Sequence, residues 1–208
     1  MKRKLGVVCM IVGAVLLLGA LALLTFNHTQ AQKAQQFSSK AVTELKNTIA
    51  DNKNKKTDSS DFSGTTTDNE QINEVRIDGY SYIGYLSIPS QGLELPVMSG
   101  WDYDKLNIAP CRYSGTVEEE NLVVIAHNYS SHFGNLDQLG VTDEVLFTDI
   151  NGDVTIYQVA CVDVVPPSSA NEVVSGDFDL TLVTCTYGGK TRFVVYCDEL
   201  QNNSEIQN

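Results

Sequence analysis

The pattern of hydrophobic and polar positions divides the chain into three parts. Residues 5–26 are an apolar run that contains neither a charged residue nor Pro. Residues 27–74 are polar, and their second half is rich in Ser, Thr, Asp and Asn. From residue 75 onward, short apolar or alternating runs are separated by turn residues, which is the pattern of a folded β domain.

Seven runs in the third part predict β-strands. They cover residues 82–88, 93–98, 121–127, 144–150, 153–165, 179–185 and 191–197. Short helices are expected after Trp101 and around residues 133–139. The spacing predicts a mostly β domain, either a closed barrel or a sandwich with small helices. The runs 121–127 and 179–185 are apolar on both alternating positions, so we expect central strands that are covered on both faces.

The apolar run at residues 5–26 predicts an N-terminal transmembrane helix, because about 20 apolar residues cross the hydrocarbon core. Basic residues precede it at positions 2–4, so the positive-inside rule places the N-terminus in the cytoplasm and the remainder outside. A cleaved signal peptide, cut near Ala31, is the alternative, but signal h-regions run to roughly 7–15 residues. We therefore expect a retained single-pass signal-anchor at the cell membrane, with the β domain extracellular.

The polar middle part cannot bury a core of its own, because it has few apolar residues. Parts of residues 27–56 favour helix by composition. We expect residues 27–74 to be an extracellular stalk and flexible linker. The predicted organisation is thus a basic tip and membrane span (1–26), a stalk and linker (27–74) and a folded β domain (75–208).

Charge and cysteine content limit the possible functions. The net charge is −12, and such an acidic surface repels nucleic acid, so we expect no nucleic-acid partner. Of the five Cys, four follow the apolar run, and an exported chain could pair them in disulfides. A domain of this size can fold on its own core, so at least one thiol can be free for chemistry. Whether Cys161 and Cys197 pair is open.

Two predicted central strands end in residues that can act together in catalysis. His127 ends the run 121–127, and Cys185 ends the run 179–185. A catalytic thiol needs a base or a cationic neighbour to become a thiolate near neutral pH. By itself, a Cys is more often a small buried hydrophobe, and a His at a strand end is more often structural or solvated.

A cation follows the candidate thiol closely in the sequence. Arg192 opens the last predicted strand, and the segment between it and Cys185 predicts a short hairpin connection in which Gly188 and Gly189 supply positive φ angles. Such a hairpin returns Arg192 to the neighbourhood of Cys185. A lone Arg at a strand start is usually a solvated edge residue, but thiol, imidazole and guanidinium together predict a catalytic site.

The chain offers a second imidazole beyond the apolar run. His132 lies in the segment YSSHFGN, where we expect a surface residue or the lining of a groove. We favour His127 as the catalytic imidazole, because the end of a strand is a more rigid mount than a loop.

Several motifs together resemble the sortase family. The TLVTC segment at residues 181–185 matches the strand that ends at the nucleophile, and Arg192 in TRFVV matches the family's arginine. The AHN segment at 126–128, followed by FGNLDQL, resembles the catalytic-His strand, loop and short helix. APCRYSGT at 109–116 resembles the preceding segment, with Arg112 and Ser114 in place of the family's His and Pro. The resemblance covers roughly residues 80–198, with the motifs in the family's order.

The resemblance implies a sortase-like β-barrel transpeptidase on the outer face of a Gram-positive-type membrane. Its partners would be secreted proteins that bear a C-terminal sorting motif, and an amine acceptor, commonly on a peptidoglycan precursor. Cys185 would be the nucleophile and His127 the general acid and base. Arg192 would face the oxyanion or hold the peptide. Thr184 would help to position the substrate or the oxyanion.

No cofactor is expected, and no set of metal ligands is visible in the sequence. Some sortases use calcium, but we interpret the acidic residues 118–120 as a solvated turn. A single-motif anchoring enzyme is favoured over a pilin-polymerising one. The absence of an inhibitory lid motif in the stalk and of a C-terminal apolar span argues against the pilin-polymerising type. The connection at residues 166–178 is short, which argues against family members with a helix inserted there.

Two alternatives from other functional classes stay open at this point. A cell-wall cysteine peptidase or hydrolase would use the same thiol–imidazole chemistry. The Ser-x-Gly-Cys context of L,D-transpeptidases is missing from the sequence. A non-catalytic surface β domain would instead leave Cys185 no more reactive toward alkylating agents than Cys111.

Overall fold

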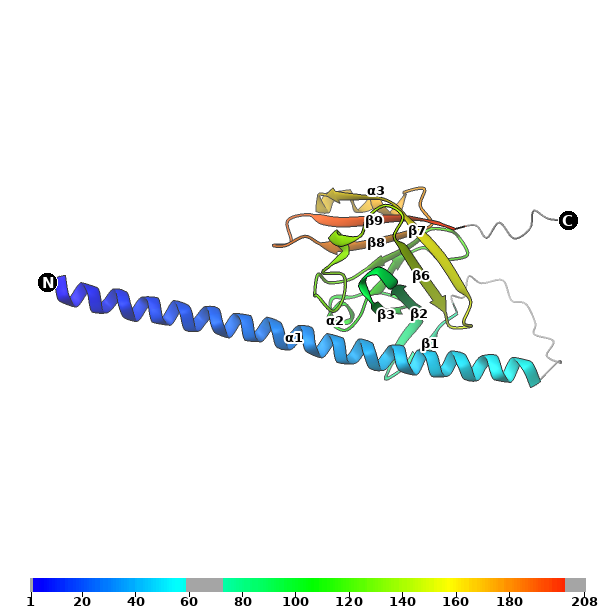
Figure 1. The fold of residues 1–208 in the computed structure, drawn as a ribbon, viewed down its shortest axis with the longest axis horizontal. Helices are drawn as coiled ribbons and strands as arrows, with labels where there is room; N and C mark the ends of the chain where they lie inside the picture. Colours follow the sequence, from blue (N-terminus) through cyan, green and yellow to red (C-terminus); the bar gives the residue numbers. More distant parts are fainter. Residues whose placement is uncertain (1, 59–72, 201–208) are drawn as a thin grey trace.

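The computed structural model describes residues 2–58 and 73–200 as one long helix beside a β-barrel with short helices (Figure 1). The strands are β1 (Val75–Ile77), β2 (Tyr80–Ile88), β3 (Leu93–Met98), β4 (Cys111–Ser114), β5 (Leu122–Ile125), β6 (Glu144–Asp149), β7 (Val154–Val165), β8 (Leu180–Cys185) and β9 (Arg192–Glu199). The helices are α1 (Lys2–Asp58), α2 (Tyr103–Leu106), α3 (Ala170–Val174) and the 3₁₀ turns η1 (Pro89–Gln91), η2 (Leu136–Gln138) and η3 (Pro167–Ser169).

The strands form one sheet in the order β1-β2-β3-β4-β5-β8-β9-β7-β6, and β2 also pairs with β6. This second pairing closes the strands from β2 to β9 into a barrel, to which β1 adds as the partner of β2. The prediction of a mostly β, closed barrel with short helices is therefore confirmed. Each predicted strand is present, and β1 and β4 are additional; β4 has only four residues and a bulged pairing, so it left little alternation to detect.

The central strands β5 and β8 are covered on both faces, as their apolar pattern predicted. One face contributes Leu122, Val124, Leu180 and Leu182 to the barrel core. On the other face, Val123 and Val183 pack outside the barrel against Val173 of α3. The two strands thus separate the barrel core from a groove beneath α3, and this arrangement puts their C-terminal ends at the groove.

The short helices follow the prediction at two places and depart from it at a third. The helix expected after Trp101 is α2, and η2 lies within the segment 133–139. The connection at residues 166–178 was expected to be too short for a helix, yet η3 and α3 occupy it. The structure corrects this expectation, because burial of Val173 against the outer faces of β5 and β8 stabilises a single helical turn. The loop therefore does not argue against any sortase type.

Part of the predicted stalk packs against the barrel. Ala41 and Leu45 of α1 lie in one apolar cluster with Tyr82 of β2 and Met98 of β3. Leu45 is fully buried, and full burial of a Leu side chain contributes ~1.5–3 kcal/mol. The composition of this region predicted helix within a stalk that holds the domain at a distance, whereas in the structure this segment of α1 is part of the folded domain.

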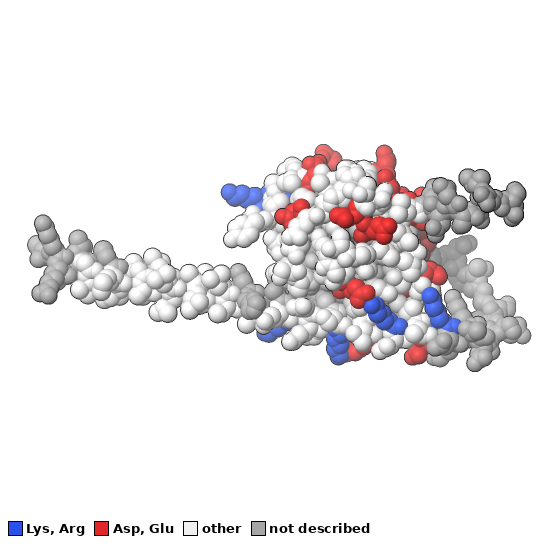
Figure 2. Space-filling model, viewed as in Figure 1, with Lys and Arg blue, Asp and Glu red and all other residues white. Residues whose placement is uncertain are grey.

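Charged side chains accompany this contact between helix and barrel. Figure 2 shows acidic side chains spread over the barrel and basic ones mainly along α1 beneath it. Lys46 lies 2.7 Å from the Glu94 carboxylate, and Lys40 lies 2.7 Å from Asp78. These pairs are exposed to solvent, so each adds little to the stability of the contact between α1 and the barrel.

The N-terminal half of α1 extends beyond the barrel (Figure 1). The expected membrane span at residues 5–26 falls on this half, and some of its side chains lie outside the described set. In the part of the chain that the structure describes, we find no helix with the length and apolar character that a membrane crossing requires.

Candidate active site

His127 and Cys185 lie at the same level of two neighbouring parallel strands. In the register of β5 and β8, Ile125 is opposite Val183, so His127 and Cys185 each follow two residues beyond a paired position. Neighbouring strands are ~4.8 Å apart. Alternation along both strands turns the two residues to the outer face, the face of Ile125 and Val183. The structure therefore brings the predicted imidazole and thiol to one end of the groove.

Two hydrogen bonds hold these strand ends together. The Ala126 N–H donates to the Val183 carbonyl at 3.1 Å, which extends the ladder beyond β5. The Thr184 hydroxyl donates to the Ala126 carbonyl at 3.0 Å and is buried. The hydroxyl expected to position substrate or oxyanion is thus used to join β8 to β5, immediately before His127 and Cys185.

Arg192 lies directly across from Cys185, as the predicted hairpin required. The two residues are cross-strand partners on β8 and β9, and Gly188 and Gly189 have the predicted positive φ angles, 82° and 71°. The Arg192 guanidinium donates from Nη1 to the Gly189 carbonyl at 3.1 Å. A second bond from Nη1 to the Thr191 carbonyl has the same length. These bonds hold the side chain at its own hairpin.

A cavity of about 260 Å³ joins the three predicted catalytic residues. Its floor is the outer face of β5 and β8, and His127, Cys185 and Arg192 all line it. One wall comes from the connection between β7 and β8, and the other is aromatic. The β7–β8 wall consists of Val165, Pro166, Pro167, Ala170, Val173 and Val174.

The aromatic wall consists of residues that the sequence analysis did not assign to the site. Trp101 stacks on Tyr113 with ring centroids 5.5 Å apart, and its edge meets Tyr103 at 5.9 Å. All three are exposed large hydrophobic residues. An exposed aromatic group is a signal for a binding surface, but the pairing of β3 with β4 is needed to bring Trp101 beside Tyr113, and the pairing of β4 with β5 places Tyr113 at the groove.

The His127 imidazole is half-buried, and burial lowers its pKa. The neutral form is therefore favoured at neutral pH, as a proton acceptor requires. Its ring lies 5.0 Å from the Tyr129 ring, centroid to centroid. The backbone carbonyl of His127 accepts a hydrogen bond from the Phe133 N–H at 3.2 Å, which closes the following loop.

The prediction that His132 is a surface or groove residue is wrong. Its side chain is completely buried, and burial, followed by the nearby His127, lowers its pKa to about 4. The ring lies against α1, where Nε2 is 3.4 Å from the Ser38 hydroxyl. The physical reason is the docking of α1, which covers a loop that would otherwise face solvent. His132 lies outside the cavity that holds Cys185.

The other described thiols are poor candidates for a nucleophile. Cys111 and Cys197 are buried, and burial raises the pKa of each to about 12. Cys161 is exposed on β7, and desolvation followed by the nearby Asp198 raises its pKa. All four described cysteines, Cys185 included, are free, so Cys161 and Cys197 do not pair. Cys185 is the one of these thiols in the cavity with His127.

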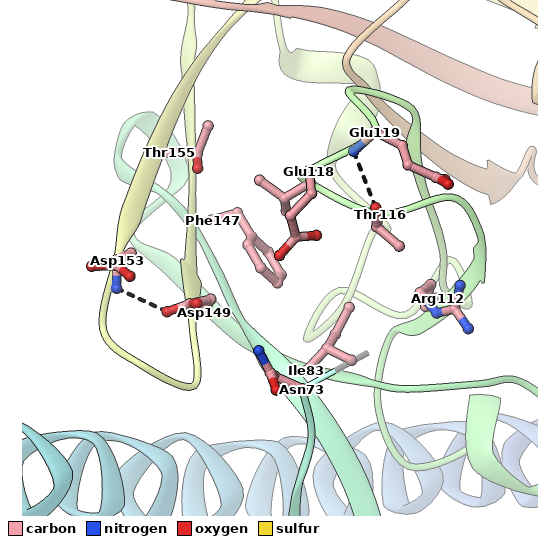
Figure 3. A pocket seen from close by; sticks show the side chains of 11 residues that line it. Asn73, Ile83, Arg112, Thr116, Glu118, Glu119, Phe147, Asp149, Asp153 and Thr155 are labelled. Carbon is pink, nitrogen blue, oxygen red and sulfur yellow. Dashed lines mark hydrogen bonds between the residues drawn. The ribbon is translucent and has the colours of Figure 1, made fainter. Parts of the chain in front are cut away.

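A larger cavity, of about 460 Å³, lies between the β6–β7 turn and the β4–β5 loop (Figure 3). Phe147 and Glu118 point into it, and Asp149 and Asp153 line its rim. It contains neither a thiol nor an imidazole. Among residues 2–58 and 73–200, no group of His, Cys, Asp or Glu side chains is arranged to hold a metal ion.

Residues 109–116, in which Arg112 and Ser114 depart from the family pattern, support the β4–β5 loop beside this cavity. Arg112 donates from Nε to the Ser99 carbonyl at 2.8 Å and from Nη1 to the Gly115 carbonyl at 3.0 Å. Ser114 follows on β4, and its buried hydroxyl has no hydrogen-bond partner among the described residues. Arg112 therefore fixes backbone at the start of the β4–β5 connection and is directed away from the candidate thiol.

Comparisons with known proteins agree on the family. The sequence profile of the sortase domain matches residues 86–200. Sortase C1 of the group B Streptococcus pilus island 1 is 25% identical, with a TM-score of 0.52 over 61% of this chain and 68% of that chain. Sortase C of Streptococcus pneumoniae is 27% identical, with a TM-score of 0.51 over 57% of this chain and 68% of that one.

A third structure shares the fold over more of the chain. The sortase D5 transpeptidase of Clostridium perfringens is 24% identical, with a TM-score of 0.59 over 79% of this chain and 99% of that chain. No curated protein sequence matches the chain. Because the sortase profile covers more than half of its residues, the chain belongs to the sortase family of cysteine transpeptidases.

Proposed function

We propose that this sortase cleaves a C-terminal sorting motif of secreted proteins through a thioester at Cys185 and transfers the acyl group to an amine. The observation that carries the proposal is the register of β5 and β8, which sets His127 and Cys185 side by side at one cavity. Arg192 across the hairpin completes the set of thiol, imidazole and guanidinium.

The reaction has two steps that use the same imidazole. His127 takes the proton of the Cys185 thiol as Sγ attacks a backbone carbonyl carbon, and it gives this proton to the leaving amine when the C–N bond breaks. An incoming amine then gives a proton to His127 as it attacks the thioester, and His127 passes this proton to Sγ when the C–S bond breaks and the thiol is released. Microscopic reversibility therefore requires the leaving and incoming amines to occupy the same place beside His127.

Arg192 and Thr184 have supporting roles in this proposal. The guanidinium presents a planar set of donors near the thiol and stabilises the negative oxygen that forms when Sγ attacks. The bonds from its Nη1 to the hairpin carbonyls orient it for this role. Thr184 holds the ends of β5 and β8 in register through its bond to the Ala126 carbonyl, so it acts on the geometry of the site.

The proposed acceptor rests on the family resemblance, and the proposed location rests on the apolar run near the N-terminus. The proposed acceptor is the amine of a peptidoglycan precursor, and the enzyme would anchor single proteins to the cell wall. The proposed location is the outer face of the membrane, with residues 5–26 as a single-pass anchor. The β8–β9 connection extends toward the side of the N-terminal half of α1, an orientation that would direct the site toward a membrane-bound acceptor (Figure 1).

The full-length chain in detergent, offered a library of peptides with varied C-terminal sorting motifs, tests this function. Intact mass should show an acyl adduct on Cys185 that disappears when an oligoglycine amine is added, with an amide product. Cys185→Ala should give neither. Release of a truncated peptide at the same yield with and without amine would indicate a hydrolase instead. A binding domain would give no adduct, and its Cys185 would alkylate no faster than the exposed Cys161.

A further inference from the structure

Two buried side chains, Ser38 and His132, and the half-buried Ile108 meet where α1 passes the barrel. The Ser38 hydroxyl on α1 donates to the Ile108 carbonyl, in the connection between α2 and β4, at 3.1 Å. The same oxygen lies 3.4 Å from Nε2 of His132. Ser38 is 3% exposed and His132 is 0% exposed, so the contact is shielded from water on all sides.

The hydrogen-bond pattern assigns the tautomer of His132. Because the Ser38 hydroxyl donates to Ile108, its oxygen can accept from His132, so the proton of the ring is assigned to Nε2. Nδ1 has no hydrogen-bond partner among the described residues. A buried imidazole is costly to leave without polar contacts. The polar contacts of Nε2 with Ser38 and with the Ile108 carbonyl therefore help to hold this ring in place.

The loop that carries His132 begins at His127 and is compact. The His132 N–H donates to the Tyr129 carbonyl at 2.9 Å, and the Gly134 N–H donates to the same oxygen at 2.8 Å. A Cβ at Gly134 would come within 2.6 Å of that oxygen, so the loop tolerates no side chain there. Together with the bond from Phe133 to the His127 carbonyl, these contacts make residues 127–134 one unit.

Ring contacts continue from this junction to the active site. The Tyr129 ring lies between the two imidazoles, with its centroid 5.6 Å from His132 and 5.0 Å from His127. A displacement of His132 would therefore move Tyr129 and, with it, His127. Packed rings transmit such shifts because interiors are close-packed.

We propose that Ser38 and His132 are positioning residues, through which the docked helix α1 sets the place of the His127 imidazole relative to Cys185. This inference rests on the proposed catalytic role of His127. It makes the segment of α1 around Ser38 part of the catalytic unit, although it lies far from Cys185 in sequence and does not line its cavity.

Adjacent serines on α1 supply a matched pair of variants. Ser38→Ala removes the buried hydroxyl, whereas Ser39→Ala removes an exposed one that bonds only within the helix, to the Gln35 carbonyl at 2.7 Å. Ala is the best helix former, so both full-length variants should fold. The chain has three His, which allows the ring signals of a histidine-labelled sample in detergent to be assigned by substitution.

The first measurement does not need activity. In Ser38→Ala, the ring signals of His132 and His127 should shift, and the titration midpoint of His127 should rise toward the ordinary value as its loop loosens. Ser39→Ala should match the wild type. An unchanged His127 midpoint in Ser38→Ala would overturn the proposal.

The second measurement tests whether the contact between Ser38 and His132 affects acyl transfer. Loss of one hydrogen bond is worth about fivefold, so kcat of acyl transfer should fall by about that factor in Ser38→Ala, with KM for the peptide within twofold. An unchanged kcat, despite a shifted His127 midpoint, would also overturn the proposal. If the wild type forms no thioester at all, the proposed function fails, while the titration still decides whether α1 sets the position of His127.

Discussion

Arg192 is the direct cross-strand partner of Cys185, and its guanidinium is held by backbone carbonyls of its own hairpin. A planar guanidinium can keep such bonds from one nitrogen while others face a reacting oxygen. An ammonium on Lys lacks this geometry. In the proposed mechanism, the pair thus joins a nucleophile to a donor whose shape, as well as its charge, matters.

Arg192→Lys separates these two contributions. We expect the variant to fold normally and to lose ~10²–10³ in turnover, as for removal of one oxyanion donor. Its alkylation profile with pH should change little, because the positive charge is kept. Near-normal turnover would contradict the donor role. Near-normal turnover together with an unchanged alkylation profile would instead support a purely electrostatic role. One preparation serves both measurements.

The cysteine substitutions test the choice of nucleophile. Cys185→Ala should abolish acyl transfer, while Cys111→Ala and Cys197→Ala should keep most of it, because both thiols are buried away from the cavity. Each of the latter two should cost about 1 kcal/mol of unfolding free energy. Activity and urea unfolding measured on the three variants check this. Equal loss of activity in all three, with folding intact, would mean that the assignment is wrong.

Thr184 offers a test of how the strand ends are joined. Thr184→Val keeps the shape but removes the donor to the buried Ala126 carbonyl, which should cost ~1–3 kcal/mol of unfolding free energy. Thr184→Ser keeps the hydroxyl and should recover most of this loss. Turnover should follow the same order, because the bond sits next to both His127 and Cys185. If Val and Ser behaved alike in urea unfolding, the bond would not be the cause.

The buried imidazole of His132 should make the stability of the folded chain depend on pH. Its pKa is lowered to about 4 in the folded chain, first by burial and then by His127, against about 6.5 when unfolded. The unfolded state therefore takes up the proton first. The free energy of unfolding is therefore highest above pH ~6.5 and decreases as pH falls toward 4. We expect a decrease of roughly 2 kcal/mol between pH 7 and 5.

Urea unfolding at these two pH values measures the effect. The matched control is His132→Phe, which keeps a buried ring without a titrating group. Its unfolding free energy should fall less than that of the wild type over the same interval. Parallel curves for the two proteins would show that another group is responsible.

The proposed anchor predicts the state of the mature N-terminus. If residues 5–26 are retained, the mature protein should fractionate with membranes and carry these residues by mass. A signal peptide would instead be removed. Recovery of mature, released chains that begin near Gln32 would contradict the anchor and leave the catalytic proposal unaffected.

Local patterns in the sequence were enough for the strands and for the candidate catalytic residues. A strand that is apolar on both faces must be covered on both, and β5 and β8 are, so the positions of His127 and Cys185 at their ends could be predicted. The Gly188–Gly189 pair likewise fixed the hairpin that returns Arg192 to Cys185, because positive φ angles favour Gly.

The tertiary structure alone decided what surrounds these residues. The buried side of α1 repeats every three or four positions, a pattern that was present in the sequence, but only the closed barrel supplies the surface on which it packs. That contact buries His132, which the sequence placed at the surface. The Thr184 hydroxyl and the aromatic wall depend in the same way on partners distant along the chain. Local periodicity fixes which face of an element is buried, whereas the partner that covers it is set by long-range packing.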